Sequence, residues 1–208
     1  KLGKRISELY IDPLSAYELL QHLTYSNNKK RDLFAYIYSI IDTNEMRPYL
    51  NVKRNEIDKI EVRAELVKKE IPGESPEAWD EDYEEYLSKI KSCLLLESWI
   101  NERGEEWILE QFGVRPGELH YKIQNADWLL YCSKELSRMT ELGEARKKIN
   151  ELRVRVKYGV KKDILTLLKL KGIGRVRART LYAAKIKDLG DVKKVEIHQL
   201  ARLIGPEL

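Results

Sequence analysis

The chain has 208 residues, of which 35% are charged and 43% hydrophobic, and this composition fits one or two globular domains. It excludes a membrane protein, because no apolar run approaches the roughly 20 residues of a membrane span, and no apolar stretch follows Lys1–Arg5 as in a signal peptide. The two cysteines, Cys93 and Cys132, match no metal-binding spacing, so we expect no metal site and a reduced, cytoplasmic setting.

The periodic segments of the chain are helical throughout. Asp12 followed by Pro13 is typical of a helix start, because an acidic N-cap and a proline at the first helical position both fit there. Pro48 interrupts the pattern, and Ile71–Pro76 predicts a loop. In chain order, the expected helices cover residues 13–23, 28–42, 51–69, 81–101, 105–112, 118–140 and 144–158.

These segments predict an all-α fold, in which a bundle of roughly seven helices over residues 1–158 precedes a small domain over residues 159–208. Gly159 marks the expected boundary. In the small domain we expect a helix-hairpin-helix, with arms at Asp163–Lys169 and Arg175–Lys185, and then a shorter helical pair. Six apolar residues are expected to pack the arms together: Ile164, Leu167, Leu168, Val176, Leu181 and Ala184.

Charge is divided unevenly along the chain, although the net charge is only +4. From Ala145 to Leu208 there are 18 Lys or Arg against 6 Asp or Glu, so this part carries +12 and the rest carries −8. A basic third of this kind is typical of a protein that binds a polyanion. The acidic stretch Glu74–Glu85 would repel DNA, so we expect it to face away from DNA or to contact a basic partner.

The segment between the hairpin arms combines a glycine-rich turn with a dense run of cations. Its residues are Lys171, Gly172, Ile173 and Gly174, followed by Arg175, Arg177 and Arg179. Two glycines allow a tight turn and a close approach of the backbone to a ligand. The first N–H groups of the following helix lack intrahelical partners and attract phosphate oxygens. We therefore predict that these seven residues bind a nucleic-acid backbone, the alternative being a plain helical connection with a glycine cap.

The helix expected at 118–140 carries an unusual tryptophan. At about 100° per residue, one broad apolar arc holds Leu119, Ile123, Ala126, Leu129, Leu130, Cys132 and Leu136. Trp128 falls outside this arc, on a polar face that it shares with Tyr121 and Glu135. An aromatic side chain there is a candidate platform for a nucleobase. The alternative is that Trp128 covers the edge of the bundle or contacts a neighbouring domain, and we expect Trp79, Trp99 and Trp107 to be structural.

Three motifs, in this order, resemble the archaeal Ski2-like superfamily 2 DNA repair helicases, the family also called Hjm. Ser7–Ala16 resembles the start of that family's helical ratchet domain. Gly117–Leu119 and Asn125–Tyr131 resemble its ratchet helix, and Leu170–Arg179 resembles its C-terminal helix-loop-helix domain. The resemblance covers essentially the whole chain, and it implies that the first few residues end a preceding winged-helix domain.

This resemblance implies part of an ATP-dependent helicase that moves 3′ to 5′ on single-stranded DNA at forked replication intermediates. In such a family Trp128 would stack on a base, and Tyr121, with Lys122 beside it, stands where some relatives have an arginine. Arg175, Arg177 and Arg179 would grip the emerging strand and restrain the motor. The implied partners are single-stranded and forked DNA, the parent's motor and winged-helix domains, and replication or repair proteins, in a cytoplasmic, nucleoid-associated setting.

Catalytic machinery is missing from the sequence. There is no Gly-x-x-x-x-Gly-Lys-[Ser/Thr] motif and no alternating β and α pattern. We therefore expect no catalytic residue, metal site or cofactor in this chain, and assign ATP and magnesium to motor domains elsewhere in the parent protein. Two other readings stay open: a module that docks repair proteins, and a helix-hairpin-helix DNA glycosylase, for which Asp188 and Asp191 are the candidate acids.

Overall fold

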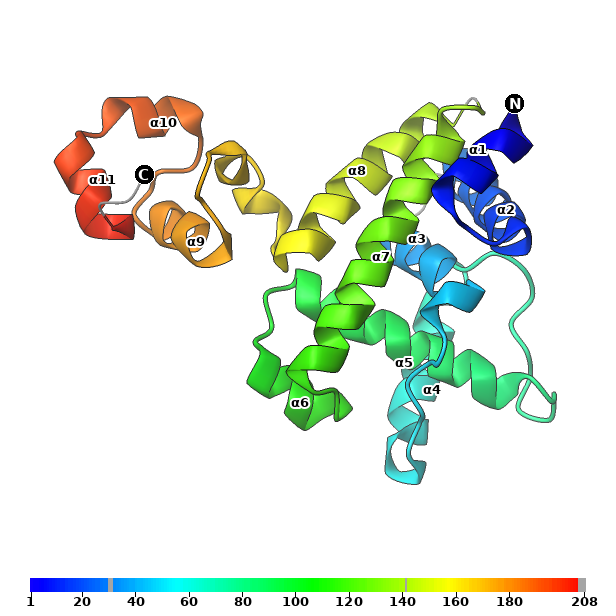
Figure 1. Ribbon diagram of the computed structural model, residues 1–208. Helices are drawn as coiled ribbons and strands as arrows, with labels where there is room; N and C mark the ends of the chain where they lie inside the picture. The colour runs from blue at the N-terminus through cyan, green and yellow to red at the C-terminus, as the bar shows by residue number, and fades with distance from the viewer. Residues whose placement is uncertain (30–31, 141, 206–208) are drawn as a thin grey trace.

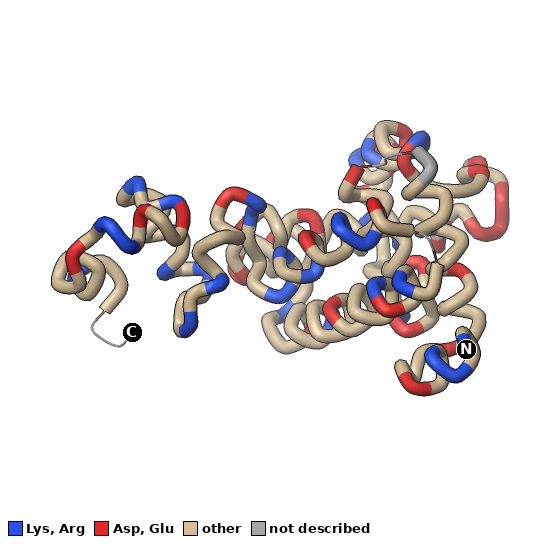
Figure 2. The backbone as a smooth tube through the Cα atoms, turned by 90° about the horizontal axis from the view of Figure 1, so that it is seen from above, with Lys and Arg blue, Asp and Glu red and all other residues tan. Residues whose placement is uncertain are grey.

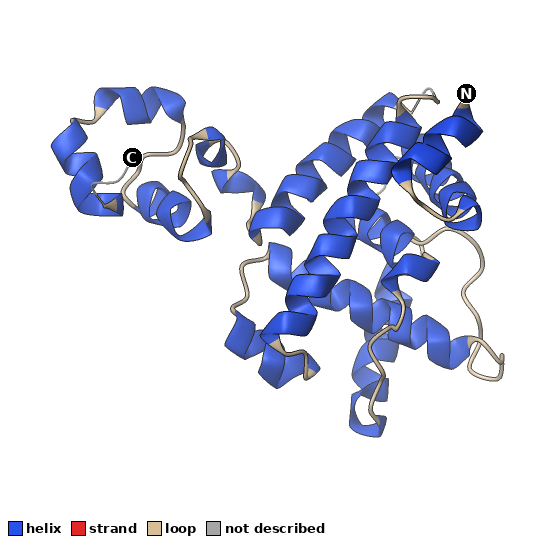
Figure 3. Ribbon diagram, viewed as in Figure 1, coloured by secondary structure: helices blue, strands red, loops and turns tan. Residues whose placement is uncertain are grey.

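The computed structural model describes residues 1–29, 32–140 and 142–205, and every regular element in those ranges is helical (Figure 3). The predicted all-α fold class is therefore confirmed. Helices α1–α8 form a bundle, and a smaller unit with α9–α11 extends from one end of it (Figure 1). We call residues 1–158 the bundle and residues 159–205 the hairpin unit.

The helices of the bundle are α1 (Leu2–Leu9), α2 (Pro13–Lys29), α3 (Leu33–Ile41), α4 (Ile57–Val67), α5 (Tyr83–Ile100), α6 (Glu105–Phe112), α7 (Pro116–Ser137) and α8 (Gly143–Tyr158). Two short 3₁₀ turns, η1 (Asn44–Met46) and η2 (Arg54–Glu56), lie between α3 and α4. The hairpin unit contains the 3₁₀ turns η3 (Lys162–Ile164) and η4 (Leu167–Lys169), followed by α9 (Arg175–Ala183), α10 (Leu189–Lys194) and α11 (Ile197–Ile204).

Several element boundaries differ from the sequence prediction. Helix α1 was not predicted. Helix α2 continues to Lys29, so the next helix does not begin at Asn28. Helix α3 starts at Leu33 because Asp32 caps it, accepting a hydrogen bond from the Leu33 N–H at 2.6 Å. Helix α4 starts at Ile57. Just before it, the Glu56 carboxylate accepts a hydrogen bond from the Lys53 N–H at 2.8 Å.

Helices α7 and α8 form the central pair of the bundle (Figure 1). All seven residues of the apolar arc predicted on α7 are buried. On α8 the apolar stripe consists of Ala145, Ile149, Leu152 and Val156, each with no exposed surface. Each large side chain buried in this way stabilises the fold by about 1.5–3 kcal/mol. The apolar periodicity of both helices is thus confirmed.

The hairpin unit has a hydrophobic core of its own. Buried residues of the bundle form one cluster between Leu9 and Val156, and those of the hairpin unit form a second between Val160 and Ile204. The first hairpin arm consists of two 3₁₀ turns, η3 and η4, in place of the predicted helix. Val176 is 77% exposed and Ala184 is also exposed, so the prediction that they pack between the arms was wrong. The side of α9 that packs inward carries Ala178 and Leu181.

Basic and acidic residues are mixed along the backbone of both units, but one acidic loop lies apart from the hairpin unit (Figure 2). Figure 2 shows the acidic loop between α4 and α5 at the end away from the hairpin unit, in which lysines and arginines recur along the backbone. The acidic loop would therefore lie away from a polyanion bound at the hairpin unit, which stays a prediction.

Candidate nucleic-acid interface

The turn between η4 and α9 has the geometry of an anion-binding helix start. Gly172 has a φ of +76°, a left-handed conformation that favours glycine, and Gly174 is the N-cap of α9 in an extended conformation. The first α-helical hydrogen bond of α9 runs from the Ala178 N–H to the Gly174 carbonyl at 2.9 Å. The N–H groups of residues 175–177 therefore lack intrahelical partners. Lys171 and Gly172 are exposed beside them, whereas Ile173 is buried and anchors the turn.

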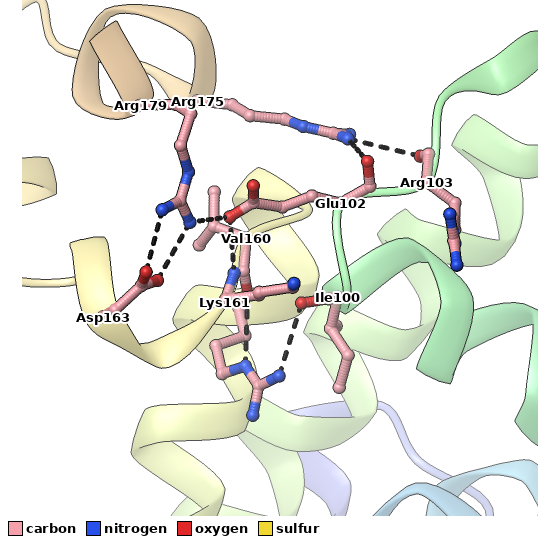
Figure 4. Close-up of polar contacts among 9 residues, drawn as sticks. Ile100, Glu102, Arg103, Val160, Lys161, Asp163, Arg175 and Arg179 are labelled. Carbon is pink, nitrogen blue, oxygen red and sulfur yellow. Dashed lines mark hydrogen bonds and ion pairs between the residues drawn. The ribbon is translucent and has the colours of Figure 1, made fainter. Parts of the chain in front are cut away.

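The three hairpin arginines do not share one face. Arg177 lies on the side of the turn, where its Nη1 donates to the Gly172 carbonyl at 3.0 Å. Arg175 and Arg179, one helical turn apart, point instead toward the bundle (Figure 4). The sequence correctly placed a cluster of cations here, but it did not show that the cluster faces two ways.

Arg179 joins two carboxylates at the junction between the bundle and the hairpin unit. Its guanidinium donates to both oxygens of Asp163, at 2.8 and 2.9 Å, and to the Glu102 carboxylate (Figure 4). Glu102 also accepts a hydrogen bond from the Lys161 N–H at 3.0 Å. Burial alone would raise the pKa of Glu102, but these hydrogen bonds outweigh it and lower that pKa. The hydrogen bond from Arg179 likewise lowers the pKa of Asp163.

Arg175 makes a second connection at this junction. It donates to the carbonyl of Glu102 and, at 3.3 Å, to that of Arg103. Its guanidinium lies 5.2 Å from the centroid of the Trp99 ring, a cation–π contact. Contact of Arg175 or Arg179 with DNA would therefore compete with contacts inside the protein.

Trp99 and Gly159 hold the chain together where α8 ends. The Trp99 indole N–H donates to the Val156 carbonyl at 2.7 Å, so its predicted structural role is confirmed. Gly159 has a φ of +62°, and a Cβ there would lie 2.5 Å from the Trp99 ring. Only glycine fits, because both the conformation and the ring exclude a side chain. Trp79, by contrast, is 81% exposed, so the prediction of a structural role for it was wrong.

The polar face predicted on α7 is partly covered by the N-terminal segment. Trp128 is half-buried against the bundle core, and its indole N–H donates to the Leu9 carbonyl at 3.3 Å. Glu135 is buried, and Arg5 binds it at 2.5 Å. The sequence prediction treated this face as open because the angular positions of side chains on one helix carry no information about its neighbours. Helix α1 packs across this face of α7.

Tyr121 and Lys122 have opposite environments. Tyr121 is 56% exposed and free to meet a ligand on the open part of α7. Lys122 is buried, and its ammonium donates to the Pro48 carbonyl at 2.8 Å. Burial lowers the pKa of Lys122. The expectation that Lys122 contacts DNA is therefore corrected, because its side chain is used inside the bundle to hold the segment after η1.

The two aspartates considered for glycosylase chemistry cap a helix. Asp188 is the N-cap of α10 and accepts from the Asp191 N–H at 2.9 Å, while Asp191 accepts from the Lys187 N–H at 3.0 Å. Within the described ranges, no group of three or more His, Cys, Asp or Glu residues is placed to hold a metal ion. No described helix is long and apolar enough to cross a membrane.

A comparison with protein families matches residues 34–159 to the family model "Archaeal helicase, domain 4". The match covers more than half of the chain. This chain belongs to the archaeal helicase domain 4 family. The resemblance to archaeal Ski2-like helicases is thereby confirmed, and the matched range of the domain 4 family takes in α3 to α8 and ends at Gly159.

Individual relatives match this chain beyond the range of the family model, including the hairpin unit. Each is named ATP-dependent DNA helicase Hel308. The protein from Methanococcus vannielii is 40% identical over 202 residues, covering 93% of this chain and 25% of the relative. The one from Methanocaldococcus jannaschii is 38% identical over 209 residues, covering 100% of this chain and 16% of the relative. The one from Caldivirga maquilingensis is 34% identical over 212 residues, covering 99% of this chain and 28% of the relative. The chain thus spans between 16% and 28% of the length of these relatives.

Glu102, which joins the bundle to the hairpin unit, was not predicted from the sequence. Glu102 follows α5 in a short turn with a φ of +69°, and no motif marks it. A positive φ at a non-glycine residue is unusual and can indicate a local constraint. That signal exists only in the structure, where Glu102 meets Arg175, Arg179 and Lys161 from the other unit.

Proposed function

We propose that this chain is the single-stranded DNA-binding part of an ATP-dependent DNA helicase that acts in replication-fork repair. The relatives that match along its length are ATP-dependent DNA helicases. In this proposal the parent's motor domains bind ATP and magnesium and move the protein 3′ to 5′. The chain itself supplies contacts to the strand and has no activity alone.

The observation that carries the proposal is the start of α9. Its N–H groups without intrahelical partners, the exposed Lys171 and the nearby Arg177 bring positive charge and hydrogen-bond donors to one turn. A phosphate there would be held by hydrogen bonds from the N–H groups, by the helix dipole and by the two cations. Arg175 and Arg179 add to the positive potential and, through Glu102 and Asp163, fix the orientation of the hairpin relative to the bundle.

The exposed face of α7 would support the bases of the same strand. Tyr121 is exposed, and the half-buried Trp128 lies two turns further along the helix. Stacking of a base on such a side chain contributes about 1–3 kcal/mol and tolerates any base. Between motor strokes, stacking of this kind would keep the strand from slipping back.

The hairpin contact is tested by titrating a fluorescent dT oligonucleotide into the chain. We expect the variant with Lys171→Ala and Arg177→Ala to bind more weakly, and with a smaller salt dependence because two phosphate contacts are lost. The matched control carries Lys193→Ala and Lys194→Ala, which removes the same charge from the same unit. Equal binding by the two variants would contradict the hairpin contact.

Protein docking is a second candidate function, favoured by the loop between α4 and α5. Trp79 is 81% exposed there among acidic residues, an arrangement suited to a basic partner surface. Binding of dT that is unaffected by the hairpin changes would favour this role over a nucleic-acid grip.

A further inference from the structure

A groove runs between the bundle and the hairpin unit, outside the turn described above. It lies along α7 and α8 and is closed on one side by η4, with a volume of about 570 Å³. A volume of this size is in the range of sites that enclose ligands. Its lining residues are Asp127, Lys134, Asn150, Glu151, Arg153, Val154, Lys157, Tyr158, Leu165, Leu168 and Lys169.

The carboxylates of the groove are already neutralised. Asp127 receives two hydrogen bonds from Arg153, at 2.8 and 3.1 Å. Glu151 forms an ion pair with Lys162 at 2.9 Å. Because each acid has its own cation, neither cancels the charge of the remaining lysines.

Three lysines from three elements face the groove without a carboxylate of their own. Lys134 comes from α7, Lys157 from α8 and Lys169 from η4. None of them forms an ion pair with the residues that the structure describes, although Lys157 lies over the Tyr158 ring at 5.7 Å. Three like charges around one groove repel each other, and an anion that spans them relieves that repulsion.

The remaining surface of the groove is apolar or aromatic. Val154, Tyr158, Leu165 and Leu168 form this part of the lining. A positively charged groove with aromatic and apolar surface is the arrangement by which proteins bind single-stranded nucleic acid, whose bases are free to leave the stack. A second cavity of about 360 Å³ shares Asp127 and Lys157 with the groove and continues along α7 past Gln124 and His120.

We infer that this groove binds the backbone of single-stranded DNA, with Lys134, Lys157 and Lys169 meeting successive phosphates and Tyr158 offering a surface to a base. The groove lies along α7 and α8 and reaches the hairpin unit at Leu165, Leu168 and Lys169. This inference rests on the proposed function, because it assigns a further segment of the same strand to residues outside both predicted contact regions.

The charge contribution is tested with a triple variant, Lys134→Gln, Lys157→Gln and Lys169→Gln, and a control with Lys4→Gln, Lys59→Gln and Lys193→Gln, exposed lysines outside the groove. For single strands the slope of log affinity against log salt is about −0.7 per phosphate contact, so we expect the groove variant to lose about 2 from that slope. A slope equal to that of the control overturns the inference.

A second readout locates the strand directly. Both native cysteines are buried, so a cysteine introduced on the surface reports alone. Asn150→Cys lines the groove, and Asn55→Cys on η2 is the exposed control. Saturating dT oligonucleotide should slow thiol labelling of the first and leave the second unchanged.

The remaining outcomes separate the inference from the proposed function. Unprotected Asn150→Cys in a chain that binds dT overturns the groove but not the DNA-binding role. A wild-type chain that binds no dT overturns both. Protection by polyglutamate but not by dT assigns the groove to an acidic protein partner and overturns the inference.

Discussion

Glu102 connects three segments that are distant in sequence. Its carboxylate accepts from Arg179 and from the Lys161 N–H, and its carbonyl accepts from Arg175. The junction between the bundle and the hairpin unit therefore depends on one acidic side chain, and two of the three arginines predicted to meet DNA are committed to it. Whether those arginines also reach phosphate stays a prediction.

Acid should weaken this junction. The folded pKa values of Glu102 and Asp163 are both lowered, from unfolded values of about 4. A group with a lowered folded pKa stabilises the protein above its unfolded pKa, and that stabilisation is lost as pH falls through the folded value. We expect wild type to lose thermal stability on acidification below about pH 4, and Glu102→Gln to lose less over that window. Parallel pH profiles would contradict the role of Glu102.

Gly159 provides a second test at the residue scale. Alanine there meets the Trp99 ring and must adopt a positive φ. A left-handed residue costs about 1–2 kcal/mol, and overpacking adds about 1–3 kcal/mol, so we expect Gly159→Ala to lower the unfolding free energy by about 2–5 kcal/mol. Gly117→Ala is the control, since nothing lies within 4 Å of its Cβ position and its φ is ordinary. Urea unfolding compares the two, and equal stability would contradict the contact.

At the scale of elements, the packing of α1 on α7 gives Trp128 two roles that substitutions can separate. Trp128→Ala removes a half-buried ring, and we expect a stability loss of about 2 kcal/mol, below the 3–5 kcal/mol of a fully buried aromatic. It should also weaken dT binding by the stacking energy. Trp128→Phe keeps an aromatic ring for stacking, but it loses the hydrogen bond to the Leu9 carbonyl, about 1 kcal/mol, and part of the packing of the larger indole.

The control for this pair is Trp79→Ala, which removes an exposed tryptophan from the loop between α4 and α5. We expect it to change neither thermal stability nor dT affinity. If Trp128→Ala lowered stability yet bound dT as tightly as wild type does, the tryptophan would be structural only.

Features that depend on local sequence patterns could be predicted, and features that depend on contacts between distant residues could not. The 3.6-residue periodicity of α7 and α8 is local, and the structure buries the residues it picks out. Residue Lys122 was misjudged because its partner, the Pro48 carbonyl, is 74 residues away. Val176 was misjudged because its place on α9 is set by Ala178 and Leu181, which pack inward instead. Glu102 carries no local signal, since its importance arises from the other unit.

At the scale of the whole molecule, two hydrophobic cores meet at Gly159, whereas the basic part of the chain begins earlier, at Ala145 in α8. Charge asymmetry could be predicted from composition alone, because it needs no knowledge of contacts. The groove between the units could not, since its three lysines converge only after α7, α8 and η4 are packed. A strand that followed the groove would touch both units, so its affinity would depend on the junction that Glu102 maintains.

The most direct measurement is the affinity of the wild-type chain for a dT oligonucleotide at several salt concentrations. Contacts with three or more phosphates should give a slope of log affinity against log salt steeper than about −2. We expect that slope, with tighter binding at low salt. Absence of binding, or an affinity that does not change with salt, would contradict a role in holding single-stranded DNA.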